Sequence, residues 1–108
     1  MQQANLTIEN SVILVSGTVD VHTVLKLRRE GEKAIATVPH LIEVDLEGVQ
    51  KIDSSIASLL CCWHRFAKKQ QKQILFKHIS VAVLNLLKLY GIKNILTLND
   101  KHKELQNG

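Results

Sequence analysis

The sequence lacks the features that define secreted, membrane-spanning or disulfide-stabilised proteins. Only two cysteines occur in 108 residues, and they are neighbours, Cys61 and Cys62. Adjacent cysteines cannot easily close a disulfide on a helix, and neither has another cysteine to pair with. The first residues show no basic start, and no stretch approaches the roughly 18 apolar residues that a membrane-spanning helix needs. We therefore expect a reduced, cytoplasmic protein without a signal peptide, which meets a membrane only through a partner.

Aromatic residues and a concentrated charge are also scarce. Aromatics make up 4% of the chain, which leaves few rings for stacking on bases and argues against single-strand nucleic-acid binding. The formal charge of +4 is spread along the sequence, apart from the cluster Lys68-Lys69-Gln70-Gln71-Lys72. Because cations suit a helix C-terminus, we interpret this cluster as a solvated helix end. The length predicts a single domain over 1–108, with an ordered core at about 5–97 and a polar tail at 99–108.

The apolar pattern of the first half predicts a hairpin followed by a helix. Two short apolar runs, at 6–8 and 12–15, indicate the two strands of the hairpin. Helical periodicity then places Val21 and six later residues up to Val38 on one buried stripe, with Asp20 as the N-cap. Gly31 lies on this stripe, which indicates a close approach of the helix to a sheet.

The second half predicts alternating strands and helices. Residues 41–46 read as a strand that ends in a turn at Glu47 and Gly48, and a helix follows from Ser54 to about Gln70. Its apolar stripe comprises Ile56, Leu59, Leu60, Trp63, Phe66 and Ala67. A strand at 74–76, a third helix capped by Ser80 and a candidate last strand at 93–96 complete the order. The order ββαβαβα predicts an α/β fold in which helices pack on a mixed β-sheet.

One run carries a family resemblance. Residues 41–55 read LIEVDLEGVQKIDSS, which is a strand, a D-L-x-x-V segment and a D-S-S start of a helix. This run resembles the signature of STAS domains, and the resemblance covers roughly residues 6–97. Within the family, the chain is most similar to the cytoplasmic STAS subunits of Mla phospholipid transporters of Gram-negative bacteria. That similarity rests on the Leu-x-Leu-Arg run of the first helix, on Ala67-Lys68-Lys69-Gln70 and on Leu87-Lys88-Leu89-Tyr90.

The resemblance implies a binding function. It implies a non-catalytic accessory subunit that binds the ATPase of an ABC transporter and supports the assembly and activity of this transporter. Such a transporter moves phospholipid between the inner and outer membranes and so serves outer-membrane lipid asymmetry. The subunit would be cytoplasmic, held at the inner membrane through its partner.

A second class of STAS domains offers an alternative function. Anti-sigma factor antagonists carry the same Asp-Ser pair, and a partner kinase phosphorylates the serine, which Ser54 matches by position. These antagonists usually have a glycine soon after this serine, whereas this sequence has Ile56. We expect the branched side chain to alter how closely a kinase can dock.

The predicted site is the start and the outward face of the second helix. Asp53 or Ser54 can accept hydrogen bonds from the free N–H groups of the first turn, and the helix dipole would tolerate a phosphate there. From the pattern alone a structural cap is the simpler interpretation; the resemblance favours a contact site. The outward stripe is small and smooth for two turns and then basic, although it could also be an ordinary surface. The predicted partner-binding residues are Asp53, Ser54, Ser55, Ala57, Ser58, Cys61 and Arg65.

Metal and enzyme functions find little support in the sequence. Cys61 and His64 could share a metal on a helix, but two ligands are too few for a zinc site, and the five histidines show no ligand spacing. Asp45 and Asp53 have neither a nucleophile nor a cofactor-binding loop beside them, and no glycine-rich phosphate loop occurs. We expect no catalysis, no cofactor and no metal.

Overall fold

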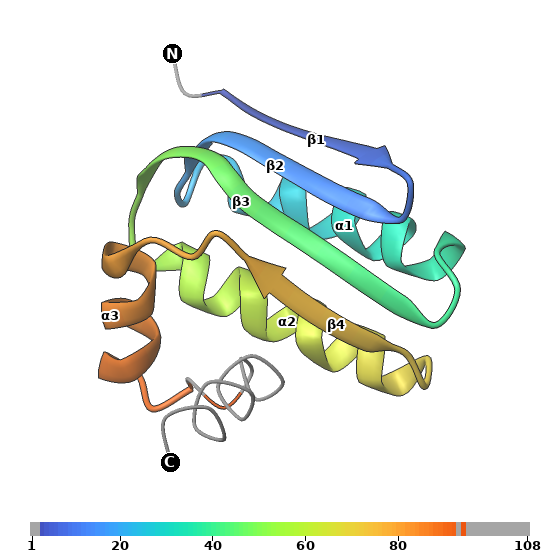
Figure 1. Ribbon diagram of the computed structural model, residues 1–108. Coiled ribbons are helices and arrows are strands. Elements are labelled where there is room, and N and C mark those ends of the chain that lie inside the picture. Colours follow the sequence, from blue (N-terminus) through green and yellow to red (C-terminus); the bar gives the residue numbers. More distant parts are fainter. Residues whose placement is uncertain (1–2, 93, 95–108) are drawn as a thin grey trace.

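A four-stranded sheet and three helices form the described part of the chain. The computed structural model describes residues 3–92 and residue 94 (Figure 1). The elements are β1 (Ala4–Glu9), β2 (Val12–Val19), α1 (Val24–Thr37), β3 (Leu41–Ile52), α2 (Ser55–Lys69), β4 (Gln73–Lys77) and α3 (Val81–Leu89). This is the predicted order ββαβαβα. The candidate strand at 93–96, apart from Asn94, and the tail at 99–108 lie outside the described residues.

The sheet is mixed and follows the order of the chain, β1-β2-β3-β4. β1 and β2 are antiparallel, whereas β2, β3 and β4 are parallel to one another. The predicted hairpin turns through Asn10 and Ser11, whose φ angles are 51° and 69°. Two consecutive residues with positive φ are typical of the tight two-residue turns that match the twist of the flanking strands.

All buried strand residues point to the same side of the sheet, and α1 and α2 cover that side (Figure 1). Alternation along each strand explains this, because successive side chains point to opposite faces. Among the described residues, no helix covers the other face. The strand residues of the core are Ala4, Ile13, Val15, Val19, Ile42, Val44, Leu46, Ile74 and Phe76.

The predicted turn at Glu47 and Gly48 is wrong, because β3 continues through it to Ile52. In the pairing with β2, Leu14 lies opposite Asp45 and Ser16 lies opposite Gly48, so β3 carries one extra residue there. A Cβ on Gly48 would lie 2.8 Å from Cβ of Ser16 and 3.0 Å from the carbonyl oxygen of Val15. The glycine therefore serves a bulge at which the two strands pass closely, not a chain reversal.

The expected start of α1 also needs correction. Asp20 does not cap the helix: its Oδ1 accepts from the N–H groups of His22 (2.9 Å) and Thr23 (3.2 Å) in a preceding turn. The helix begins at Val24, one turn later than the pattern predicts. Val21, which was expected on the buried stripe, is 66% exposed because it belongs to this turn.

Gly31 permits a close approach, but to another helix and not to the sheet. A Cβ on Gly31 would lie 2.2 Å from ring atoms of Trp63 on α2. Trp63 is 0% exposed, and its Nε1 donates to the carbonyl oxygen of Arg28 at 3.3 Å. The indole of α2 thus occupies the space that a side chain on α1 would need, and this contact sets the distance between the helices.

The basic cluster after α2 has two different roles. Lys68 and Lys69 are exposed, as expected of a solvated helix end. Lys72 is instead half-buried, and its Nζ donates to the carbonyl oxygens of Ile35 (2.6 Å) and Ala36 (3.1 Å) in the last turn of α1. A cation there satisfies free carbonyl groups and suits the negative end of the helix.

Candidate functional site

The start of α2 is fixed by Asp53, whose carboxylate connects two segments. Oδ1 accepts from the N–H of Ser55 (2.7 Å), and Oδ2 accepts from the N–H of Val21 (3.2 Å) in the turn before α1. Burial alone would raise the pKa of Asp53, but these hydrogen bonds outweigh it and lower the pKa. Asp53 is therefore an ionised structural anchor at the helix start.

Ser54 precedes α2 with an exposed side chain that does not act as a cap. In the described part of the chain, its hydroxyl makes no hydrogen bond that would hold it. Of the two residues expected to accept from the first turn, only Asp53 does so. This leaves the Ser54 hydroxyl available at the positive end of the helix.

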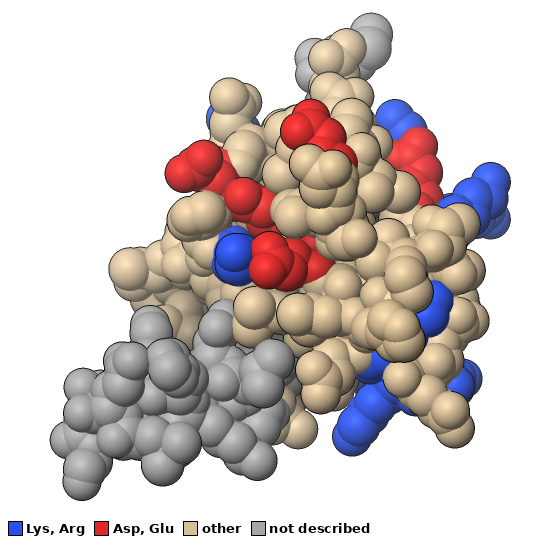
Figure 2. Space-filling view, turned by 45° about the vertical axis from the view of Figure 1, so that its right-hand side comes forward, with Lys and Arg blue, Asp and Glu red and all other residues tan. Residues whose placement is uncertain are grey.

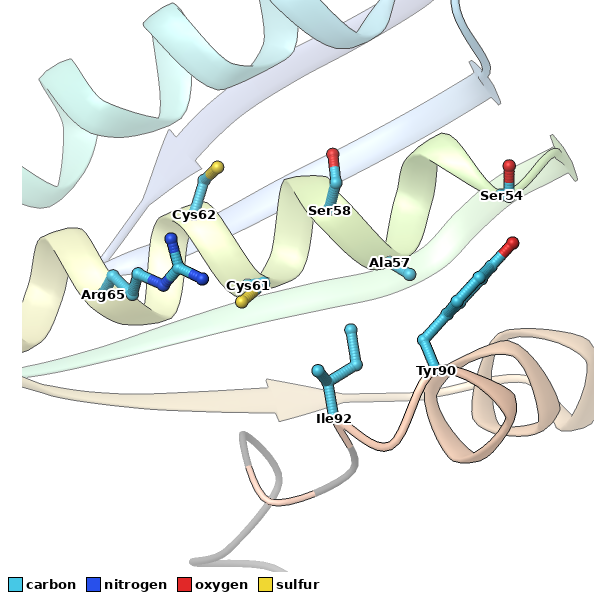
Figure 3. Close-up of a pocket in the computed structure, with 8 residues that line it drawn as sticks. All are labelled: Ser54, Ala57, Ser58, Cys61, Cys62, Arg65, Tyr90 and Ile92. Atoms are coloured by element: carbon cyan, nitrogen blue, oxygen red, sulfur yellow. The ribbon is translucent and has the colours of Figure 1, made fainter.

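The outward face of α2 forms the floor of a shallow pocket. Figure 3 shows Ser54, Ser58 and Arg65 spaced along this face, with the two cysteines between Ser58 and Arg65. The pocket has a volume of about 320 Å³ and is lined by Ser54, Ala57, Ser58, Cys61, Cys62, Arg65, Tyr90 and Ile92. Small side chains keep the floor close to the helix backbone, so another element can approach closely.

The pocket brings together five of the seven predicted residues. Ser54, Ala57, Ser58, Cys61 and Arg65 line it, although Ala57 is only 3% exposed and lies at its base. Asp53 and Ser55 do not line it; at the helix start, the Asp53 carboxylate accepts from the N–H of Ser55. The arrangement is thus a pocket next to a helix start that Asp53 holds in place.

Tyr90 and Ile92 form a wall that sequence reasoning missed. They flank Gly91, which has a φ of 68° and ends α3. The N–H of Ile92 donates to the Leu87 carbonyl (2.9 Å) and that of Gly91 to the Lys88 carbonyl (3.0 Å), which is the Schellman arrangement. The turn directs Ile92 back toward α2 (Figure 3). A glycine such as Gly91 is typical of a helix end, but only the fold shows which helix the residues around it face.

Charge is unevenly distributed around the molecule. In Figure 2, acidic side chains gather near the middle of the face in view, and basic side chains lie mainly along its right-hand side. On the open sheet face, Glu43 pairs with Lys77 (3.0 Å) and Asp45 with His78 (2.8 Å). Among the described residues that line the pocket, one is charged, Arg65, and it is exposed. The site is therefore apolar in its floor and basic at one end.

Residues 3–98 match the family model described as "Mlab, STAS domain". The chain belongs to the STAS domain family. A search of curated proteins found no match.

Solved structures agree with this STAS fold. The anti-sigma factor antagonist SpoIIAA in its unphosphorylated form matches with a TM-score of 0.66 and 19% identity, over 83% of this chain and 82% of that one. The phosphorylated form of SpoIIAA, a Bacillus cell fate determinant, gives 0.63 and 18%, over 83% and 85%. A STAS domain protein from Planctomyces limnophilus, titled an anti-sigma-factor antagonist, gives 0.64 and 21%, over 85% of each chain. At these identities the likeness shows the fold.

The STAS domain offers no arrangement of catalytic groups at this pocket. The lining residues include no carboxylate and no histidine that could act as a base beside the Ser54 hydroxyl. Across residues 3–92 and 94, no three His, Cys, Asp or Glu side chains gather as metal ligands would. In the same residues, no helix is long and apolar enough to cross a bilayer.

Proposed function

We propose that this STAS domain is a non-catalytic accessory subunit of an ABC transporter that moves phospholipid and maintains outer-membrane lipid asymmetry. It binds the ATPase of the transporter, supports its assembly and activity, and stays in the cytoplasm, at the inner membrane through this partner alone. The observation that supports the proposal most directly is the smooth outward face of α2, in a chain that matches the Mlab family model.

The pocket suits an apolar side chain of a partner protein. Its floor is built from serine, alanine and cysteine, and Ile92 and the Tyr90 ring supply an apolar wall. Burying a side chain the size of Leu or Phe contributes about 1.5–3 kcal/mol. Arg65 at one end would pair with an acidic group of the same partner, which adds orientation more than affinity. A central anchor with a charged rim is the usual anatomy of a protein interface.

The test adds bulk and charge to the middle of this face. Ser58→Arg and Cys61→Glu are made in a tagged domain, which is co-expressed with the ATPase and permease of a phospholipid ABC transporter from the same genome. We expect both variants to lose co-purification of the ATPase while their unfolding midpoints stay close to that of the wild type. Asn85→Arg and Ala82→Glu make the same additions at exposed positions of α3 and should retain the ATPase. Retention by both pocket variants would place the interface elsewhere.

A specific observation also favours a second function, that of an anti-sigma factor antagonist switched at Ser54. Ser54 is exposed and its hydroxyl makes no hydrogen bond with the described residues, and the similar SpoIIAA structures include a phosphorylated form. Ile56 was expected to alter how closely a kinase can dock, but its side chain is 0% exposed and points into the core. Ile56 therefore cannot hinder a kinase directly and does not distinguish the two functions.

Phosphorylation of Ser54 separates the two proposals. A phosphate would add close to two negative charges to a contact surface. The antagonist function predicts phosphorylated Ser54 in protein isolated from its own cells, detected by mass spectrometry, and an anti-sigma kinase partner that Ser54→Ala retains and Ser54→Asp releases. The accessory-subunit function predicts an unmodified Ser54 and a transporter ATPase as the bound protein.

A further inference from the structure

In the part of the chain that the structure describes, β1 lies at one edge of the sheet, and some of its backbone groups are bonded to no other strand. The carbonyl oxygen of Gln3 accepts from the N–H of Thr18 at 2.8 Å. In an antiparallel ladder, hydrogen bonds to the neighbouring strand alternate along the chain. The N–H and C=O groups of Ala4, Leu6 and Ile8 therefore point away from β2, to the outer edge. Unpaired groups of this kind are a template for an additional strand.

An apolar groove accompanies this edge. It has a volume of about 430 Å³ and is lined by Leu6, Thr7, Ile8, Glu30, Lys33, Ala34 and Thr37, from β1 and α1. Leu6 is half-buried, and Ile8 is 45% exposed although it points to the helix side of the sheet. At the other edge, in β4, the helix-facing residues Ile74 and Phe76 are buried. Within residues 3–92, β1 is the edge that combines open backbone groups with uncovered apolar side chains.

We propose that a second copy of the chain occupies this edge, with its β1 antiparallel to the first β1 and the two-fold axis at Leu6. The pairing is self-complementary. Leu6 lies opposite Leu6 of the second copy, and the small Ala4 lies opposite the large Ile8, so the apolar row of each strand fills the groove of the other. On the open face, Glu9 lies opposite the neutral Gln3. No like charges meet along the strands.

The surroundings of the edge permit this pairing. Glu30 and Lys33 give the groove one charge of each sign, so two grooves brought together carry no net repulsion. The Nζ of Lys26 donates a hydrogen bond to the carbonyl oxygen of Ala4 at 3.3 Å; this side chain is exposed and can turn outward, which frees the carbonyl for a second strand. α1 lies between this edge and the α2 pocket, because it contacts both β1 and α2. The two four-stranded sheets become one continuous sheet while both pockets stay open.

Cysteine cross-linking tests the register. Leu6→Cys and Thr7→Cys are introduced separately into a chain with Cys61→Ser and Cys62→Ser, and the folded proteins are oxidised with diamide. At the two-fold axis the Leu6 Cα atoms would be about 5.5 Å apart, within disulfide reach. The Thr7 Cα atoms would be offset diagonally by about 8 Å, which is beyond it. We expect a disulfide-linked dimer from Leu6→Cys and none from Thr7→Cys.

Sedimentation of the unmodified chain tests the dimer itself. We expect a concentration-dependent dimer that Ile8→Lys weakens by at least about tenfold in Kd, because a lysine would enter the groove of the second copy. Thr7→Lys, on the open face of the same strand, and Ser58→Arg, in the pocket, should leave the dimer intact. A wild type that is monomeric at every soluble concentration overturns the proposal. A dimer whose Kd Ile8→Lys leaves unchanged also overturns it. Equal cross-linking of Leu6→Cys and Thr7→Cys overturns it as well, and would point to another register or another bound segment.

Discussion

The two faces of α2 differ in what they require of their side chains. The inner face carries large apolar residues, among them Trp63 and Leu60, that are fully buried against α1 and the sheet. The outer face carries serine, cysteine and one arginine around a pocket. A change on the inner face alters packing that the whole domain shares, whereas a change on the outer face meets the pocket, its wall of Tyr90 and Ile92, and solvent or a partner. One helix therefore separates the residues that determine folding from those that we propose determine binding.

The largest effect is expected from Trp63→Ala on the inner face. Removing a fully buried aromatic side chain leaves a cavity and should cost about 3–5 kcal/mol of unfolding free energy. Chemical denaturation monitored by circular dichroism measures this cost. Ser58→Arg, on the outer face of the same helix, is the control and should stay within about 0.5 kcal/mol of the wild type. Equal costs for the two variants would remove the distinction between the faces.

A smaller loss of stability is expected from Gly31→Ala, which changes the α1 side of the contact with Trp63. The added methyl group would overlap the Trp63 ring, and overpacking typically costs about 1–3 kcal/mol. Alanine also favours helix by about 1 kcal/mol over glycine, so the observed loss is the difference between these effects. Gly31→Ala combined with Trp63→Phe should recover part of the loss, since the smaller ring makes room. Additive losses in the double variant would show that the two positions do not act through this contact.

These two residues also show how far sequence reasoning reaches. The buried stripe of α2 was predicted correctly, because a 3.6-residue period reports which face is apolar. The predicted packing partner of Gly31, a sheet, was wrong, since the period of apolar residues says nothing about which element covers the apolar face. The bulge at Gly48 was mistaken for a turn for a related reason: strand register depends on a neighbour far along the chain. Ile56 was judged by its position in a motif, although its place in the helix already put it on the apolar stripe.

Local chemistry explains what was predicted well and what was missed in the site. Ser80 caps α3 as expected, with its Oγ accepting from the N–H of Val83 at 3.2 Å, because capping depends on neighbours in sequence. The outer stripe of α2 was found by the same short-range logic. The wall formed by Tyr90 and Ile92 was missed because it depends on the packing of α3 against α2.

The C-terminal ends of α2 and α3 allow a third prediction. α2 ends like α3, with N–H groups of Gln71 and Lys72 bonded to the carbonyls of Lys68 and Ala67, but Gln71 holds its φ of 60° without being glycine. A non-glycine residue in this conformation is disfavoured by about 1–2 kcal/mol. We expect Gln71→Gly to stabilise the domain by up to about 1 kcal/mol, since the extra freedom of glycine in the unfolded chain offsets part of the gain.

Gly91 supplies the reciprocal variant. A Cβ on Gly91 would meet nothing within 4 Å, so Gly91→Gln adds only the backbone cost and should destabilise the domain by about 1 kcal/mol. Thermal unfolding of the two variants measures both changes. If both variants changed the stability of the domain in the same direction, the left-handed conformation would not be what distinguishes these helix ends.

The smallest effect concerns His64, which lies between the two faces of α2. Its pKa is lowered from 6.5, first by burial and then by the charge of Lys68. The folded state therefore binds fewer protons than the unfolded state, and stability should fall as the pH drops from 6.5 through the lower folded value. His64→Gln should remove this part of the dependence when unfolding is followed between about pH 8 and about pH 5. An unchanged pH profile would assign the dependence to other groups.

The hydrogen bonds of Asp53 and Lys72 have a consequence for the kinetics of recognition. Asp53 holds the start of α2 to the turn before α1, and Lys72, just after α2, holds the last turn of α1. The pocket floor thus belongs to a rigid pair of helices that is formed before any partner arrives. Association then requires little ordering of this surface, and rigid docking of two preformed surfaces typically proceeds at about 10⁵–10⁷ M⁻¹s⁻¹. Differences in affinity among variants of the pocket should appear in the lifetime of the complex and not in the speed of its formation.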